Sequence, residues 1–214
     1  MFLIVGGCES DREELEASNS CVWCRLNGAD LAGVDLAGAT LWMTFLERAD
    51  LQGAILKGAN INRVKFTGAN LTQANLSGAD ARKTVFTHAD LSGADLSDAN
   101  LAEAILEEAN LTGAKLDGAT MLITIMHRAD FSGASLVSAN VRQALGRETV
   151  FAGADLSGAD LGWAVLAGAD FRQANLSGAD LEGADLTGAD LTGAIWTDTS
   201  PCLSRSCNGR AYSE

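Results

Sequence analysis

The chain has 214 residues, of which 28 are acidic and 15 are basic, so its formal net charge at pH 7 is −13. This excess of negative charge argues against direct binding of nucleic acid, because phosphate contacts need clustered lysine and arginine side chains. The composition is 47% hydrophobic but only 6% aromatic, and no window approaches the roughly 18 apolar residues of a transmembrane helix. We therefore expect a narrow core filled by alanine and leucine.

Residues 1–20 lie outside the repeat that fills most of the chain, and we expect them to form an N-terminal arm. Residues 2–7 followed by Cys8 are similar to the end of a bacterial lipoprotein signal, in which small residues precede a lipidated cysteine. The apolar run is short and no basic residue precedes it, so a plain arm is the alternative. Ser10 and Glu13 have the spacing of a capping box, which predicts a short helix over residues 11–17 that covers the start of the repeat.

Two pairs of cysteines flank the repeat. Cys21 and Cys24 occupy positions where the repeat carries leucine and alanine; a C-x-x-C pair indicates redox chemistry only in a βαβ context, so we expect a structural disulfide or two buried thiols. Cys202 and Cys207 lie in the tail, residues 199–214, close enough to form a second disulfide, which leaves Cys8 lipidated or free. This usage favours an oxidising compartment, and we expect a periplasmic, lumenal or secreted protein, attached to a membrane only through Cys8, with a cytoplasmic location as the alternative.

Between residues 21 and 198 the chain repeats a five-residue unit, A-(D/N)-L-x-G, without insertion or deletion, and the central leucine-type position i falls at every fifth residue up to 196. An α-helix cannot use this period, because a step of five residues turns about 500° and scatters the leucines around the axis. In extended backbone the residues at i−2 and i point to one side and the residue at i−1 points to the other. We expect the frequent glycine at i+2 to form a turn with unusual dihedral angles.

These uninterrupted units, such as A-D-L-S-G and A-N-L-T-Q, resemble the pentapeptide repeat family. The resemblance implies an all-β fold, a right-handed quadrilateral parallel β-helix with four units per coil and about nine coils, with a short N-terminal arm or helix and a C-terminal cap. It also implies a closing segment from residue 195 onward, as in exported bacterial members. Some members bind DNA gyrase and protect it through an acidic, rod-like surface that mimics DNA.

Departures from the repeat predict one apolar face. At i−1, the residues found every twenty positions from 45 to 165 are apolar apart from Lys65, and at a coil spacing of about 4.8 Å they span about 29 Å. We expect these residues and the adjoining corner to bind a second copy or another protein; the alternatives are covering by the chain's own termini and no role. The candidate interface residues are Trp42, Met43, Phe45, Val85, Ile105, Leu122, Ile123, Ile125, Leu145, Trp163 and Val165.

Two further features depart from a uniform repeat. Gly146 occupies a leucine-type position, which predicts either filling by neighbouring side chains or a bend of the coil. The C-terminal third is predicted to carry an acidic surface made of Asp155, Asp160, Asp170, Asp180, Asp185 and Asp190.

The pattern offers no site for catalysis. The two histidines, His88 and His127, fall at outward positions, and no nucleophile, base and acid converge in an interior of alanine and leucine. We therefore expect no enzyme activity, cofactor or metal, and a structural or protein-interaction scaffold. The alternative is a gyrase-binding DNA mimic, although a charge of −13 on a rod of about 42 Å gives about one charge per 3 Å, against one per about 1.7 Å in duplex DNA.

Overall fold

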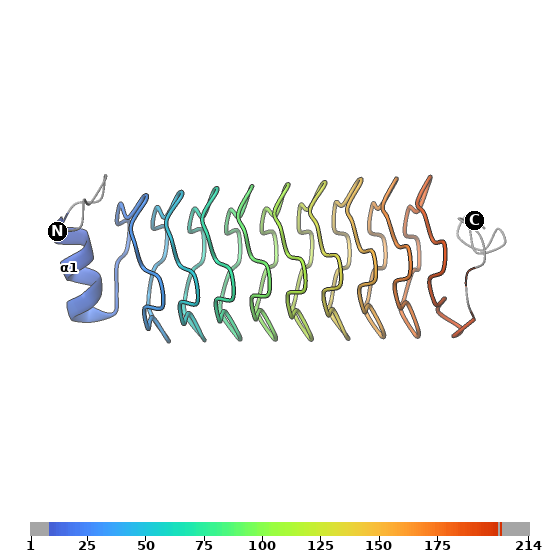
Figure 1. Ribbon diagram of the computed structural model, residues 1–214, viewed down its shortest axis with the longest axis horizontal. Helices are drawn as coiled ribbons and strands as arrows, with labels where there is room; N and C mark the ends of the chain where they lie inside the picture. Colours follow the sequence, from blue (N-terminus) through green and yellow to red (C-terminus); the bar gives the residue numbers. More distant parts are fainter. Residues whose placement is uncertain (1–8, 201, 203–214) are drawn as a thin grey trace.

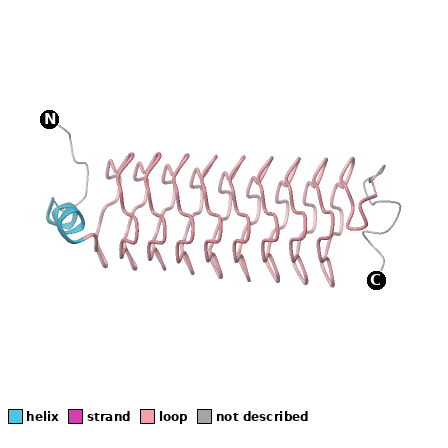
Figure 2. Cartoon of the chain, turned by 90° about the horizontal axis from the view of Figure 1, so that it is seen from below, coloured by secondary structure: helices cyan, strands magenta, loops and turns pink. Residues whose placement is uncertain are grey.

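The computed structural model describes residues 9–200 and 202. Its framework is a solenoid of stacked coils (Figure 1) in which parallel bridges join residues twenty positions apart, from Ser20↔Thr40 to Asn175↔Ile195. Each bridge lies at the i−1 position of a unit, so one coil contains four units, as the twenty-residue recurrence predicts. Within the described range the extended stretches are single bridges separated by turns, and Figure 2 accordingly shows the solenoid as loop.

Helix α1, Glu9–Ser18, lies at the N-terminal end of the solenoid (Figure 1). Its side chain Leu15 is only 3% exposed and belongs to the core cluster. The Asp11 carboxylate accepts a hydrogen bond of 2.8 Å from the backbone N–H of Arg25. In the next coil the equivalent N–H, that of Phe45, donates to the carbonyl of Cys24, so Asp11 supplies the acceptor that a preceding coil would supply.

The bounds of α1 differ from the prediction for this segment. The helix begins at Glu9, so Ser10 lies inside it and is not the N-cap residue that the capping-box reading requires. Helix ends are the least certain part of a sequence-based assignment, because the cap residue depends on backbone geometry that spacing does not specify. The helix ends before Asn19, whose φ of 51° is in the left-handed region common at helix C-termini.

Side chains alternate between the interior and the surface as predicted, and the residues at i−2 and i are buried along nearly the whole solenoid. Phenylalanines that replace leucine stack on one another in adjacent coils. The ring centroids of Phe131 and Phe151 lie 5.2 Å apart, and those of Phe151 and Phe171 lie 5.0 Å apart. Because equivalent positions in neighbouring coils are about 4.8 Å apart, flat rings at these positions stack nearly in register.

Gly146 does not interrupt the ladder, since the bridges Ile125↔Leu145 and Leu145↔Val165 continue past it. A β-carbon added at Gly146 would lie 2.9 Å from both Met126 Cε and Leu166 Cδ2. It would also lie 2.8 Å from the hydroxyl of Thr149, which donates to the Met126 carbonyl at 2.8 Å. Neighbouring side chains therefore fill the space of the missing leucine, which is the first of the two outcomes that the sequence predicts.

The described parts of both termini lie at the ends of the solenoid (Figure 1). Cys21 and Cys24 form a disulfide in the first coil, which confirms the prediction of a structural pair. Cys202 is buried and disulfide-bonded, and its backbone donates to the Ala194 carbonyl at 2.7 Å. Its predicted partner Cys207 lies outside the described residues, as does Cys8. Over the described range, no helix has the length and apolar character needed to span a membrane.

Candidate protein-interaction surface

One column of i−1 residues is apolar over most of the solenoid, and we call it the apolar face. Its bridges run from Arg25↔Phe45 to Val165↔Asp185, so a basic residue begins the column and an acidic residue ends it. Most of its members are half-buried, and Leu145 is 37% exposed. The apolar residues of the face are Phe45, Val85, Ile105, Ile125, Leu145 and Val165.

Lys65 is the one charged residue between the ends of this column. Its ammonium group lies over the ring of Phe45, 5.1 Å from the centroid, an arrangement favoured by the negative charge density of the ring face. The methylene stem of such a lysine lies along apolar surface while the charged end reaches water. Lys65 therefore extends the apolar face rather than dividing it.

Two corners flank the apolar face, and the one that precedes it in each coil carries a side chain rather than glycine at i+2 in eight successive coils. We call it the side-chain corner. Its eight residues stand at i+2 and all have a φ between 58° and 64°. Residues other than glycine lose on the order of 1 kcal/mol or more in this region, and a β-branched residue such as Ile123 is the most strained. The members of this corner are Trp23, Met43, Arg63, Lys83, Glu103, Ile123, Gln143 and Trp163.

The two corners remote from the apolar face have mostly glycine at i+2. Examples with φ between 64° and 66° are Gly53, Gly58, Gly113 and Gly118. The strain is thus concentrated on one side of the solenoid, the side that also carries the apolar column.

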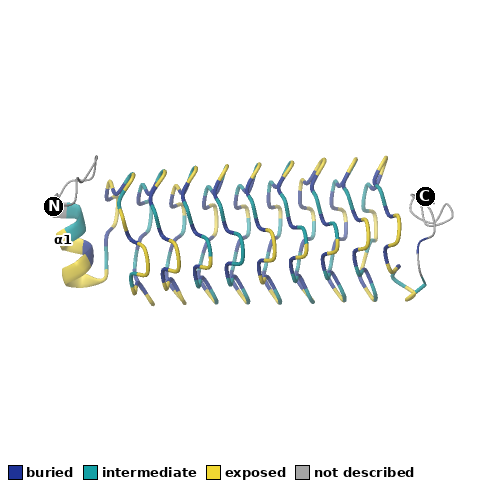
Figure 3. Ribbon diagram, in the orientation of Figure 1, coloured by how far each residue is buried: buried dark blue, intermediate teal, exposed yellow. Residues whose placement is uncertain are grey.

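Two tryptophans of the side-chain corner are the most exposed large apolar residues described: Trp23 is 57% exposed and Trp163 is 53% exposed. Trp23 contacts Trp42 edge to face, with ring centroids 5.8 Å apart. Figure 3 shows that exposed residues gather at the turns along the solenoid. The predicted interface omits Trp23, yet the register could have placed it, because Cys21 at position i puts Trp23 at i+2 in the column of Met43.

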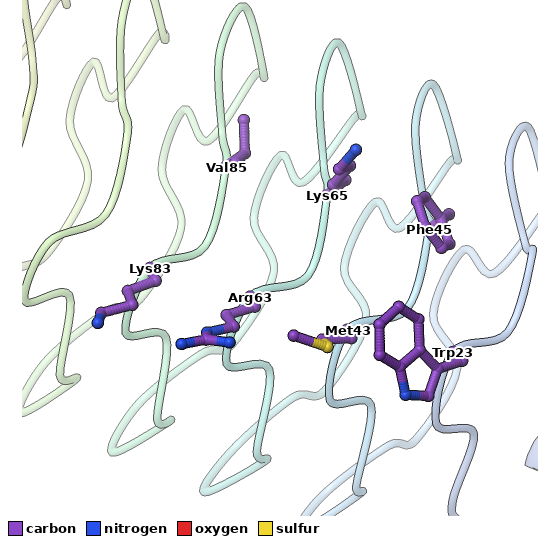
Figure 4. A pocket seen from close by; sticks show the side chains of 7 residues that line it. All are labelled: Trp23, Met43, Phe45, Arg63, Lys65, Lys83 and Val85. Atoms are coloured by element: carbon purple, nitrogen blue, oxygen red, sulfur yellow. The ribbon is translucent and has the colours of Figure 1, made fainter.

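A shallow groove of about 330 Å³ lies across the N-terminal half of this surface (Figure 4). The labelled side chains form two rows, one from the side-chain corner and one from the apolar face. Three of the lining residues are cations and none is acidic, although the whole chain has a net charge of −13. The groove is lined by Trp23, Met43, Phe45, Arg63, Lys65, Lys83 and Val85.

Charged residues farther along this side pair with one another. Lys83 lies 3.3 Å from Glu103, and Arg128 lies 2.9 Å from Glu108. These pairs are exposed to solvent, so each contributes little to stability. Both histidines point outward as predicted, but His127 has a structural contact, because its Nδ1 accepts the backbone N–H of Arg147 at 3.1 Å.

The predicted acidic surface has a structural role. For each aspartate of this surface, a carboxylate oxygen accepts a hydrogen bond from the backbone N–H two residues later, at distances from 2.9 Å to 3.1 Å. This bond caps the turn of the unit. Asparagine makes the same contact elsewhere, for example from Asn175 to Ser177. The aspartates in this role are Asp155, Asp160, Asp170, Asp180, Asp185 and Asp190.

The ion pair between Asp170 and Arg172 makes the folded protein less stable as the pH becomes acidic. Hydrogen bonds from the Arg172 side chain hold the pKa of Asp170 below its usual value, so the unfolded chain binds this proton more readily than the folded one. Its contribution to stability is therefore complete above pH about 4 and is lost as pH falls further. We expect the free energy of unfolding of Asp170→Asn, which keeps the turn contact, to decrease less than that of the parent as the pH falls below about 4. Urea titrations over a pH series measure this, and an unchanged slope would contradict the assignment.

These observations define a class of protein: a parallel β-helical repeat scaffold with a narrow apolar interior and one strained, partly apolar side. The family model described as pentapeptide repeats matches residues 29–68, 65–101, 94–122, 124–162 and 154–193. The chain belongs to the pentapeptide repeat family, as the sequence predicts.

Solved structures of the same family are similar to this chain. Trypsin-treated QnrB1, a plasmid-mediated fluoroquinolone resistance protein, is 19% identical over 82% of this chain and 78% of that one, with a TM-score of 0.59. HetL, involved in heterocyst differentiation regulation in the cyanobacterium Nostoc sp. strain PCC 7120, is 31% identical over 92% of this chain and 99% of that one, with a TM-score of 0.31. A pentapeptide repeat protein from the Arabidopsis thaliana thylakoid lumen is 31% identical over 65% of this chain and 75% of that one, with a TM-score of 0.23. A comparison with curated proteins finds no match.

Proposed function

We propose that this protein is a non-enzymatic scaffold that binds a protein through the apolar face and the side-chain corner. The observation that carries the proposal is the corner, where eight successive side chains occupy left-handed backbone. Glycine would relieve this strain, as it does at the remote corners, so stability alone does not account for these residues. The right-handed, quadrilateral form with about nine coils and a C-terminal cap, which the family leads us to expect, belongs to the same proposal.

The size of the surface fits a protein partner. The column from Arg25 to Asp185 covers eight coil steps, or about 38 Å, and with a width of roughly 15 Å it presents roughly 600 Å². Specific protein interfaces bury about 800 Å² on each side, and weaker ones bury less. We therefore expect the complex to be of moderate affinity.

The disulfides support an oxidising location. Cys21–Cys24 and the disulfide-bonded Cys202 fit a periplasmic, lumenal or secreted scaffold, attached through a lipid on Cys8 if it is anchored at all. Alkylation of denatured protein from its native host counts the thiols, and five reactive thiols would place the protein in a reducing compartment.

The alternative, a DNA mimic that binds gyrase, has weaker support. Net charge favours it, but the aspartates of the acidic surface cap turns of their own units, so their presence has a structural reason. A supercoiling assay separates the two functions: the scaffold proposal expects no change in gyrase activity at micromolar protein, and strong protection of gyrase would favour mimicry.

Photo-crosslinking in the native host tests the proposed surface. A benzoylphenylalanine placed at Leu145 should give protein adducts, because this residue is exposed on the apolar face. The matched control is Ser135, which stands at the same i−1 position on the side bridged from Lys115 to Asp155, and it should give none. Equal yields at the two positions would contradict the proposal.

The strain itself gives a second test. We expect Ile123→Gly to leave the protein at least as stable as the parent, and up to about 1 kcal/mol more stable, because glycine adopts a φ of 58° without a steric penalty. The same change should reduce the crosslinking yield from position 145. Gly113→Ala, at a φ of 64° on a remote corner where the added β-carbon meets no atom within 4 Å, serves as the inverse control and should destabilise the fold without affecting the yield. A clear loss of stability in Ile123→Gly would show that the corner is not strained.

A further inference from the structure

We propose that the apolar face binds a second copy of this chain in antiparallel orientation, with Ile105 of each chain beside a twofold axis. This inference rests on the proposed function, because it names the occupant of the same surface. It follows from the order of residues along the column, which reads Arg25, Phe45, Lys65, Val85, Ile105, Ile125, Leu145, Val165 and Asp185.

Reversing this column matches each residue with a suitable partner. Ile105 stands at the middle, so in an antiparallel pair it faces itself, and a twofold interface repeats every other contact twice. Val85 then faces Ile125 of the second copy, and Phe45 faces Val165. Because the coil spacing is the same in both chains, a single alignment brings all of these pairs opposite each other.

Opposite charges meet at both ends. Arg25 of each chain faces Asp185 of the second copy, and each end of the interface is closed by one such pair. The Arg25 side chain is exposed, and Asp185 is half-buried. A parallel pair would instead bring Arg25 against Arg25 and Asp185 against Asp185, and like charges in contact oppose association.

The wider charge distribution favours the same orientation. The groove in the N-terminal half carries three cations, whereas Glu182 and Asp185 lie on this side near the C-terminal end. In an antiparallel pair these two acidic residues lie at the level of Arg25 of the second copy, so the attraction between the ends of the two chains selects this orientation. At the axis, Glu103 of each chain is already paired with Lys83 of its own chain, 3.3 Å away.

Lys65 and Leu145 form the one pair of the reversed column in which a charged residue faces an apolar one, and they can still contact each other. Lys65 faces Leu145 of the second copy, and its ammonium group lies over Phe45, so its stem offers an apolar contact. Leu145 is the most exposed apolar residue of the column, which leaves it free to reach this stem. In the side-chain corner, Met43 faces Trp163 of the second copy, so the exposed indole gains an apolar neighbour.

Charge reversal tests the pairing. The full chain should be dimeric in sedimentation equilibrium at micromolar concentration, because roughly 600 Å² per copy is at the lower end for specific interfaces. We expect Arg25→Asp and Asp185→Arg each to weaken the dimer at least tenfold, and the double variant to restore it to within about threefold of the parent. Ile105→Asp should give a monomer, and Ser135→Asp on the remote side should remain dimeric. Asp185→Asn keeps an acceptor for the Thr187 N–H but removes the charge, so it should weaken the dimer without the loss of the turn contact. A double variant no stronger than the singles, or an Asp185→Asn dimer as tight as the parent, would overturn the pairing.

Site-specific crosslinking tests the orientation independently. With Cys8 replaced by serine, Ile105→Cys should join to itself through a short thiol crosslinker, because it faces itself across the axis. Phe45→Cys and Val165→Cys should each fail alone and join when mixed. Efficient joining of Phe45→Cys to itself would overturn the antiparallel arrangement.

One outcome separates this inference from the proposed function. If the chain is monomeric up to about 200 µM, a range well above that of specific dimers, and the probe at Leu145 still captures a different protein, then self-association is wrong while the scaffold proposal stands. If neither complex appears, both are wrong.

Discussion

Replacing Phe151 with alanine is expected to lower the free energy of unfolding by about 3–5 kcal/mol, the range for large aromatic residues in a core. Phe151 is fully buried in the middle of three stacked rings, with centroids 5.2 Å and 5.0 Å from those of Phe131 and Phe171. The ladder of bridges fixes the spacing of the coils on both sides, so the structure cannot collapse into the space that the ring leaves. Urea unfolding followed by circular dichroism at neutral pH measures the loss.

The matched control is Phe151→Leu, because leucine occupies the same column in Leu31, Leu51, Leu71, Leu91 and Leu111. Substitution by a residue that the column already accepts should cost less than about 1.5 kcal/mol. If alanine were tolerated as well as leucine, the stacked rings would not be a main source of stability.

The sequence predicted the interior of this protein well because the repeat encodes it locally. Alternation in extended backbone determines which residues point inward, and a strict five-residue period keeps that register without error over the whole solenoid. Phe131, Phe151 and Phe171 were predictable as neighbours since they are twenty residues apart. Their nearly parallel rings, at interplanar angles of 17° and 12°, depend on side-chain rotamers and were not predictable.

The candidate surface was predicted only in part. The apolar column follows from the period, but the strain at Ile123 and Trp163 is a property of backbone dihedrals, and the sequence shows only that glycine is missing. The acidic surface was interpreted through its charge, whereas Asp155 and its equivalents are explained by a contact with the N–H two residues later. That contact is local, so the alternation of aspartate and asparagine at one position could have indicated it.

Gly146 illustrates a limit of a different kind. A missing leucine can be filled by neighbours or by backbone movement, and the choice depends on how Met126 and Leu166 from the adjacent coils reach into the space. These residues are twenty positions away in sequence, so the repeat shows that they are close but not which way they point. The sequence pattern could therefore predict filling or a bend of the coil at Gly146, but it could not decide between them.

Leu15→Ala is expected to release helix α1 and to lower the free energy of unfolding by about 2–4 kcal/mol, as for other buried leucines. A helix of ten residues is marginal in water without tertiary contacts, and among the described side chains of α1 only Leu15 is buried. Release also removes the Asp11 carboxylate from the backbone N–H of Arg25. We therefore expect hydrogen exchange at the Arg25 amide to accelerate more than exchange in the middle coils.

Glu16→Ala is the control for this effect, because Glu16 lies on the same helix and is exposed, with a surface ion pair to Arg12 as its partner. It should change stability by less than about 0.5 kcal/mol. Because an uncovered first coil presents unpaired backbone groups to other chains, Leu15→Ala should also associate end to end, whereas the Glu16 variant should not. Unchanged protection of the Arg25 amide in Leu15→Ala would mean that α1 does not cap the solenoid through this side chain.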